Sequence, residues 1–193
     1  GTVAGMVEAH RKFGKLPFKD VVEPAIRLAK SLPINIPLMN SLNSRKKRLS
    51  QDPESKKIFT QQGRNWRLGD VLVQNELSST LQRIAETKGE DFYKGETATK
   101  IAEYFEKNNG LISKKDLESY RAVWRKPVSA TFDEYQIFAM PPPSSGGVHL
   151  VQLLNIMSQF PIKKAGPNTA YSTHIQTEAM KFAYADRSKY LGD

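Results

Sequence analysis

The sequence changes character near residue 122, and this change constrains the fold more than any other feature. Before it, apolar residues recur at helical spacing in several segments. After it come three stretches of strand composition, at residues 122–124, 128–132 and 135–140. Asp133 and Glu134 form a short connection between the last two stretches, which predicts a β-hairpin.

Helical periodicity, capping residues and Gly or Pro stops predict the remaining elements. The expected helices cover residues 2–13, 20–32, 68–87, 96–108, 113–120, 148–160 and 169–189. Pro24 fits a helix only within the first turn. Pro33, Pro37 and Pro53 predict a mobile or loosely packed excursion over residues 33–68, with a short helix around residues 38–50. The chain is therefore expected to be α+β, with residues 1–121 mainly helical and residues 122–193 strands followed by two helices.

Positive charge is concentrated at one end of the 193-residue chain. The net charge is +9, and residues 1–68 alone carry 14 Lys and Arg against 5 Asp and Glu. The focus is Arg45-Lys46-Lys47-Arg48, a run that favours a solvated face and, as the alternative, a basic module that binds phosphates. The run has no aromatic neighbours for base stacking, so we expect no nucleic-acid partner.

Two absences in the sequence exclude classes of site. The chain has no Cys, which excludes disulfides, thiolate metal sites and a Cys nucleophile. No apolar run approaches the ~18 residues of a membrane-spanning helix.

The strongest candidate for a site is the turn that follows the predicted hairpin. Ser144, Ser145, Gly146 and Gly147 come after three prolines, at a strand-to-helix turn where a nucleophile or an anion-binding backbone could lie. Pro143 replaces the first Gly of a G-x-S-x-G elbow, and the Lys of a P-loop is missing. The pattern therefore favours a structural turn.

Histidine patterns predict neither a catalytic pair nor a metal site. Ser172, Thr173 and His174 place a hydroxyl beside an imidazole, but adjacent residues on a helix point about 100° apart and do not form a nucleophile–base pair. His10 and His149 lie on apolar helix faces, where packing is favoured over metal binding. We expect no metal and no cofactor. Asp186 and Arg187 are expected to form an ion pair at a helix terminus.

Several segments, taken together, resemble the carboxy-terminal part of the large subunit in the gamma-glutamyltransferase (gamma-glutamyltranspeptidase) family. They match it in order along all 193 residues. The segments are Gly1–Gly5, Gly69-Asp70 with Leu72 and Gln74, Phe92–Gly95, Gly110–Ser113 with Asp116, Leu117 and Tyr120, Met140–Gly147, Phe182–Ser188 and Tyr190–Asp193.

The resemblance implies an N-terminal-nucleophile (Ntn) hydrolase with a four-layer αββα sandwich, made as a precursor that cleaves itself into large and small subunits. The new N-terminal Thr of the small subunit attacks the gamma-glutamyl amide of glutathione. Water, an amino acid or a peptide then accepts the glutamyl group. Residues 1–193 would form a partial large-subunit domain, holding the helix-rich portion of the sandwich with a few antiparallel strands, and the small subunit would be its partner.

The resemblance places the chemistry outside this chain. The family's Thr-Thr-His nucleophile segment belongs to the small subunit, and the arginine that binds the substrate carboxylate lies upstream of residue 1. We therefore assign no catalytic residue, interpret Ser144–Gly147 as architectural, and expect the chain alone to be inactive. Gly1 and Asp193 are expected to be cuts through a longer protein, periplasmic or secreted. A related cephalosporin acylase fits the same segments.

Overall fold

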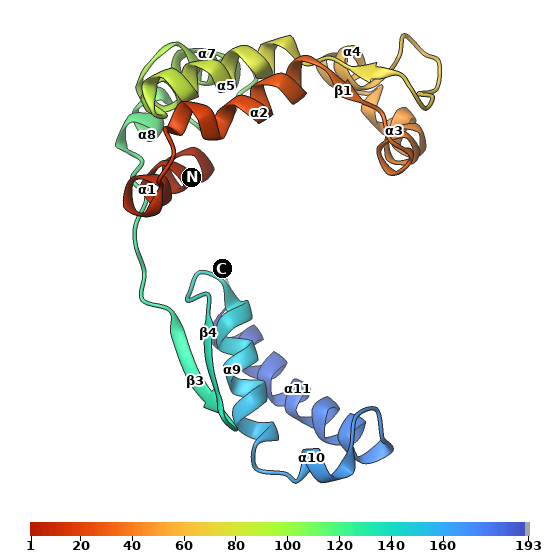
Figure 1. Cartoon of the computed structure of the whole chain (residues 1–193), viewed down its shortest axis with the longest axis vertical. Coiled ribbons are helices and arrows are strands. Elements are labelled where there is room, and N and C mark those ends of the chain that lie inside the picture. The colour runs from red at the N-terminus through yellow and green to blue at the C-terminus, as the bar shows by residue number, and fades with distance from the viewer. Residues whose placement is uncertain (192–193) are drawn as a thin grey trace. The chain divides into compact units, whose positions relative to one another are not determined.

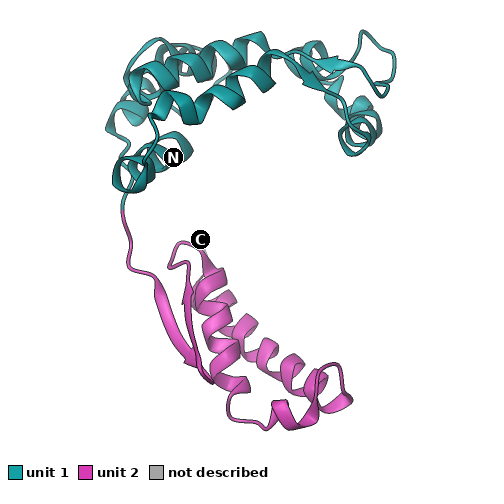
Figure 2. Cartoon of the chain, in the orientation of Figure 1, with its two compact units in different colours: residues 1–123 teal, residues 124–193 magenta. Residues whose placement is uncertain are grey.

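The computed structural model describes residues 1–191, which divide into two compact units (Figures 1 and 2). Unit 1 covers residues 1–123, and unit 2 begins at Trp124. The elements of unit 1 are α1 (Thr2–Phe13), α2 (Phe18–Lys30), β1 (Leu32–Pro33), α3 (Ile36–Leu49), α4 (Pro53–Phe59), β2 (Val71–Leu72), α5 (Asn75–Thr87), α6 (Glu90–Lys94), α7 (Glu96–Lys107) and α8 (Lys114–Ser119). Those of unit 2 are β3 (Val128–Phe132), β4 (Tyr135–Ala139), α9 (Ser145–Met157), α10 (Ile162–Ala165) and α11 (Ala170–Tyr190).

Helix α2 packs along α5 and forms the centre of unit 1 (Figure 1). Ile26 and Ala29 are buried on α2, and the hydroxyl of Ser78 donates to the Ile26 carbonyl at 3.3 Å. The restriction of Pro24 to a first turn was wrong, because α2 begins at Phe18 and Pro24 lies in its interior. Pro24 lacks the N–H that would donate to the carbonyl of Asp20, but Asp20 is exposed, so water can bond to that carbonyl instead. The burial of apolar α2 side chains against α5 keeps the helix continuous.

Residues 33–68 are folded, and the predicted loose excursion was wrong. The segment contains α3, which matches the predicted short helix, and also α4. Ile34, Leu42, Trp66 and Leu72 form a buried cluster, with Trp66 only 5% exposed. These residues come from separate parts of the chain, so no local periodicity reveals that they pack together.

The helix predicted from residue 68 begins later, at Asn75. Val71 and Leu72 instead form β2, which pairs antiparallel with β1 in the register Leu32↔Leu72. The end of α5 at Thr87 agrees with the prediction. Ile84 is buried on this helix, whereas Leu77 is 44% exposed.

The rest of unit 1 follows the sequence pattern closely. Helix α7 covers the predicted segment to within one residue, and Ser113 and Asp116 form the predicted capping box at the start of α8. Residues 92–94, for which no helix was predicted, lie in the short helix α6.

Unit 2 is a hairpin followed by helices. Strands β3 and β4 pair antiparallel from Val128↔Ala139 to Phe132↔Tyr135, so the predicted hairpin is confirmed. Residues 122–124 do not form the predicted strand. Strand composition does not suffice there, because a strand needs a partner for its backbone hydrogen bonds and β3 pairs only with β4 in the described residues.

Helices α9 and α11 pack against each other, and α9 also contacts both strands. Helix α9 spans Ser145–Met157 rather than 148–160. Its apolar residues Val151 and Leu154 are half-buried. Helix α11 confirms the predicted last helix and buries Ile175, Ala179 and Ala183. None of the described helices has the length and apolar character needed to cross a membrane.

Candidate functional site

The turn between β4 and α9 holds the predicted candidate residues. Ser144 caps α9, its hydroxyl accepting the backbone N–H of Gly146 at 3.4 Å. Gly147 is buried, and a β-carbon there would collide with the carbonyl of Met140 at the end of β4. Close approach of the helix to the strand backbone therefore requires glycine at 147. Gly146 has ample space.

Two hydrogen bonds join α11 to α9, one at the first residue of α9 and one further along that helix. Arg187 Nε donates to the hydroxyl of Ser145 at 3.0 Å. Gln152 Nε2 donates to a carboxylate oxygen of Asp186 at 2.5 Å. The ion pair predicted between Asp186 and Arg187 was wrong. These residues are successive on α11, and both side chains reach across to α9 instead.

The chemistry of the turn follows from these bonds. The bonding partner of Ser144 is a backbone amide, and that of Ser145 is a guanidinium. Neither group can accept a proton from a serine hydroxyl, so neither serine is activated as a nucleophile by the contacts described. The architectural interpretation of Ser144–Gly147 stays a prediction, and these bonds are consistent with it.

The three histidines lie in packing or surface positions. Nε2 of His10 is 2.8 Å from the Leu16 carbonyl oxygen, and the ring meets Phe18 edge-on. His149 packs edge-on against Tyr184 with ring centroids 4.4 Å apart, and its buried Nε2 has no hydrogen-bond partner in the described residues. His174 is exposed. Among residues 1–191, no three His, Cys, Asp or Glu side chains gather as a metal site would require.

Ser172 has a structural role at the start of α11. It is buried, and its hydroxyl exchanges hydrogen bonds with Thr169 in a capping box. This geometry is consistent with the expectation that Ser172, Thr173 and His174 supply no nucleophile–base pair, which stays a prediction.

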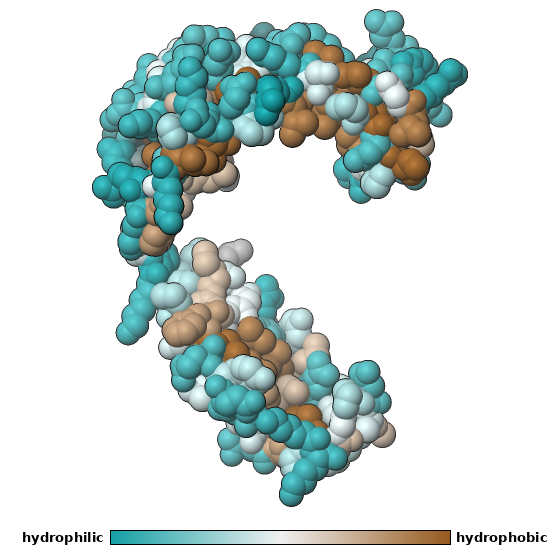
Figure 3. All heavy atoms as spheres, in the orientation of Figure 1, coloured by the Kyte–Doolittle hydropathy of each residue, from teal (hydrophilic) through white to brown (hydrophobic). Residues whose placement is uncertain are grey.

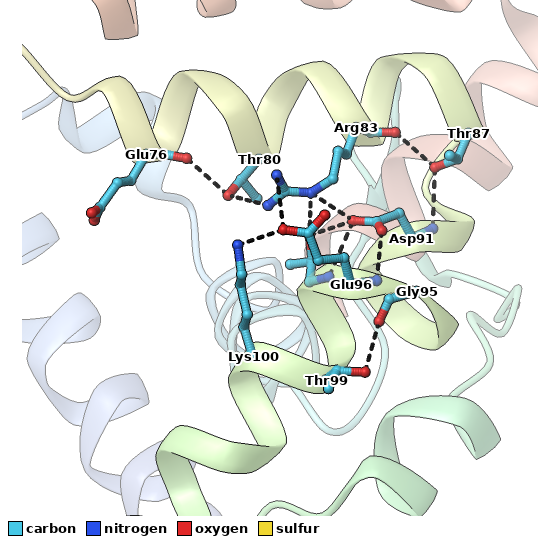
Figure 4. A network of polar contacts seen from close by, with 10 residues as sticks. Glu76, Thr80, Arg83, Thr87, Asp91, Gly95, Glu96, Thr99 and Lys100 are labelled. Carbon is cyan, nitrogen blue, oxygen red and sulfur yellow. Dashed lines mark hydrogen bonds and ion pairs between the residues drawn. The ribbon is translucent and has the colours of Figure 1, made fainter.

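A polar network around Arg83 is a feature that sequence reasoning missed (Figure 4). Arg83 Nε donates to Asp91 at 3.2 Å and to the hydroxyl of Thr97 at 3.1 Å. Asp91 accepts the backbone N–H of Glu96 at 2.8 Å and the hydroxyl of Thr97. Burial raises the pKa of Asp91, but the bonds from Thr97, Glu96 and Arg83 outweigh burial and hold that pKa below its usual value.

This network caps a helix. Helix α7 begins after Gly95, which has no side chain to cap it, and the carboxylate of Asp91 accepts the first amide instead. A side chain at 95 would collide with Asp91, so the glycine makes room for the cap. One sequence signal could have predicted this cap, namely an acidic residue, Asp91, four positions before the glycine at the N-cap.

Among the cavities of the described residues, two could hold a small molecule, and they lie in different units. The first, of about 720 Å³, lies among α1, α2 and α5, and its lining includes Arg11, Lys19, Glu86 and Lys88. The second, of about 790 Å³, lies between α9 and α11 and is lined mainly by apolar and amide side chains. Neither described lining contains a Ser, Thr or Cys, so neither supplies a nucleophile of those types.

Comparison with known proteins places the chain in a family. The family model described as Gamma-glutamyltranspeptidase matches residues 1–193. The glutathione hydrolase proenzyme of Escherichia coli is 46% identical over 195 residues, covering all of this chain and 34% of that protein. The chain therefore spans about a third of the length of this relative.

Solved structures agree in fold. The gamma-glutamyltranspeptidase of Helicobacter pylori matches with a TM-score of 0.95 and 40% identity, over 100% of this chain and 56% of that one. The cephalosporin acylase of Bacillus halodurans matches with a TM-score of 0.89 and 33% identity, over 97% of this chain and 36% of that one. The predicted fold class, a helix-rich portion of the Ntn-hydrolase sandwich with a few antiparallel strands, is confirmed. The chain belongs to the gamma-glutamyltranspeptidase family, which is a family of enzymes.

Proposed function

We propose that residues 1–193 are part of the large subunit of a gamma-glutamyltransferase. The complete enzyme cleaves gamma-glutamyl amides such as glutathione and passes the glutamyl group to water, an amino acid or a peptide. The observation that carries this proposal is the match of the family model along the entire chain, combined with coverage of only about a third of the E. coli proenzyme. The nucleophile is an N-terminal Thr that lies outside these residues.

The contribution of this chain is architectural. In unit 2, Gly147 lets α9 start directly against β4, and Arg187 and Gln152 bind α9 and α11 together. This arrangement fixes the hairpin and the two helices as one packed element. In the complete enzyme, such an element supports part of the αββα sandwich.

The small subunit of the same precursor is the proposed partner. On the β3–β4 hairpin and directly after it, Tyr135, Phe138 and Met140 are 59%, 71% and 64% exposed. Side chains of this size on a two-stranded sheet favour a partner that buries them. Pairing of the hairpin with strands of the small subunit would bury them and extend the sheet.

Expression of the gene segment that encodes this chain together with its downstream sequence tests the proposal. We expect one precursor to convert into two polypeptides that co-purify, the second beginning with Thr. A precursor that stays uncleaved, or a downstream sequence without a Thr-Thr-His segment, would contradict it.

A cephalosporin acylase is the second candidate, favoured by the structural match to the Bacillus halodurans acylase. The assembled enzyme distinguishes the two when a gamma-glutamyl anilide and a cephalosporin side-chain amide are compared as substrates. Faster release from the anilide supports the transferase. Turnover of the cephalosporin alone supports the acylase.

We also propose that the protein is periplasmic or secreted, as the family resemblance implies. Cell fractionation of the source organism, followed by immunoblotting, tests this. The protein is expected in the periplasmic or culture fraction, and recovery only in the cytoplasmic fraction would contradict the proposal.

A further inference from the structure

The positive charge of the sequence gathers on one part of unit 1, formed by α3, α4 and the segment leading to β2. Residues 36–70 contain eight Lys and Arg against three Asp and Glu, and α3 contains four cations and no acid. The exposed cations other than Arg64, which pairs with Asp70, define what we call the basic surface. Its members are Arg45, Lys47, Arg48, Lys56, Lys57 and Arg67.

The packing of α3 explains which cations face outward. Leu42 is buried and Met39 is half-buried on the core side, whereas Arg45, Lys47 and Arg48 are exposed. Lys46 is the exception. It is half-buried, and its ammonium donates to the Gly63 carbonyl and to Asn65. Lys46 therefore has a structural role, and the other three cations of the run remain at the surface.

The loop after α4 is held against α3, which brings its own cation to the same part of the unit. Asn43 of α3 exchanges two hydrogen bonds with the backbone of Trp66, at 2.8 and 3.0 Å. Lys46 bonds to the same loop. These contacts anchor Arg67 and the neighbouring Leu68 near α3, and helix α4, which carries Lys56 and Lys57, also contacts α3.

The acids nearby do little to neutralise this surface. Asp70 is occupied by a two-pronged ion pair with Arg64, at 2.7 and 3.0 Å. Asp52 caps α4 by accepting the amide of Ser55 at 2.7 Å. Glu54 is the remaining acid of residues 36–70.

Intramolecular roles do not account for so many cations. The C-terminal end of a helix carries a partial charge of about −0.5, which favours a basic residue in the last turn by less than about 1 kcal/mol at an exposed site. Helix α3 has Lys46, Lys47 and Arg48 in that turn, with Arg45 just before it. Their mutual repulsion is relieved when an external polyanion binds.

Apolar side chains beside the cations identify the class of polyanion. Leu68 is 66% exposed and follows Arg67 in the chain, and Ile36, at the opposite end of α3 from the cations, is 57% exposed. Figure 3 shows hydrophilic and hydrophobic side chains adjoining on this part of unit 1. Cations mixed with exposed aliphatic residues suit a lipid interface, where the cations meet headgroups and the aliphatic groups insert. Base stacking is disfavoured, because the aromatic residues here, Phe59 and Trp66, are half-buried and buried.

We propose that the basic surface binds the anionic phospholipid headgroups of a bilayer, with Leu68 entering the interface. The surface belongs to unit 1 and the β3–β4 hairpin to unit 2, and lipid binding requires neither glutathione nor catalytic turnover. Such binding would hold the protein reversibly at a membrane.

Co-sedimentation of the 193-residue chain with vesicles tests this. The chain is expected to bind vesicles of equal parts phosphatidylcholine and phosphatidylglycerol, to release them at about 0.5 M salt, and not to bind phosphatidylcholine alone. The variant Arg45→Gln/Lys47→Gln/Arg48→Gln should lower the partition coefficient by roughly tenfold or more. Leu68→Ser, which keeps every charge, should lower it by roughly threefold.

The matched control removes three exposed cations elsewhere in unit 1, in the variant Lys107→Gln/Lys114→Gln/Lys115→Gln. Full binding by this control supports a localised surface, whereas equal loss in both triple variants would overturn it. Circular dichroism verifies that each variant is folded. If the first triple variant does not fold, Leu68→Ser and the salt series still test the proposal independently. Tighter binding to duplex DNA than to the anionic vesicles, unaffected by Leu68→Ser, would assign the surface to nucleic acid and overturn the lipid proposal.

Discussion

At the scale of single residues, two glycines beside the same turn carry different constraints. Gly147 lies against the carbonyl of Met140, so that any β-carbon must displace the strand or the helix. Gly146 is exposed, and a β-carbon added there would lie 3.6 Å from the Ser144 hydroxyl, an ordinary contact distance. The sequence places both glycines in one turn but does not show that their constraints differ. The difference arises because the backbone of Met140 comes close to Gly147 only in the folded chain.

Gly147→Ala is therefore expected to lower the free energy of unfolding by about 2 kcal/mol, the usual cost of overpacking a close contact. Gly146→Ala should change it by less than about 0.5 kcal/mol, as surface substitutions usually do. Urea unfolding followed by circular dichroism measures both. Equal effects of the two substitutions would show that the close approach to Met140 is not what requires glycine.

Asp70 predicts an acid dependence of stability. The Arg64 guanidinium and the Arg67 amide lower the pKa of Asp70 from 3.8 to about 2. A carboxyl whose pKa is lower in the folded state stabilises that state when ionised. Its contribution is complete above about pH 4 and disappears as the pH falls toward 2.

Asp70→Asn should consequently destabilise the chain at neutral pH and have little effect near pH 2. Thermal unfolding across this pH range checks the sign. Glu106→Gln, at an exposed position near the end of α7, is the matched control and should leave the unfolding temperature unchanged at both neutral and acid pH. A difference between wild type and Asp70→Asn that is constant with pH would refute the role of ionisation.

At the scale of elements, local signals predicted those helices whose stabilising residues are close in sequence. Helices α1, α7 and α11 and the capping box at Ser113 were predictable for this reason. Three other features depend on distant partners. Strand β2 exists because Leu72 pairs with Leu32, α2 tolerates Pro24 because α5 covers its apolar face, and the cluster around Trp66 assembles from four segments.

The order of residues 33–68 can be measured with the two tryptophans. Trp66 is 5% exposed and donates through Nε1 to the Phe59 carbonyl at 2.8 Å, whereas Trp124 is 53% exposed. In Trp124→Phe, the emission of Trp66 should be blue-shifted and poorly quenched by acrylamide. In Trp66→Phe, the emission of Trp124 should be red-shifted and readily quenched. Similar quenching of both would contradict a packed core in this segment.

At the scale of the whole molecule, the ordered motifs indicated the family although no single site did. Ser144–Gly147 and Phe182–Ser188 are distant in sequence, and the structure joins these segments through the bond between Arg187 and Ser145. No catalytic group could be predicted from these residues. The proposed role, a scaffold whose nucleophile lies outside residues 1–193, accounts for the absence of any such pattern.

The most direct test of this role is the release of nitroaniline from a gamma-glutamyl nitroanilide. Residues 1–193 alone are expected to give no release above buffer, and the same residues expressed with their downstream sequence and processed are expected to give sustained release. Substituting the new N-terminal Thr by Ala in the assembled enzyme should abolish that release. Sustained turnover by residues 1–193 alone would contradict the central claim.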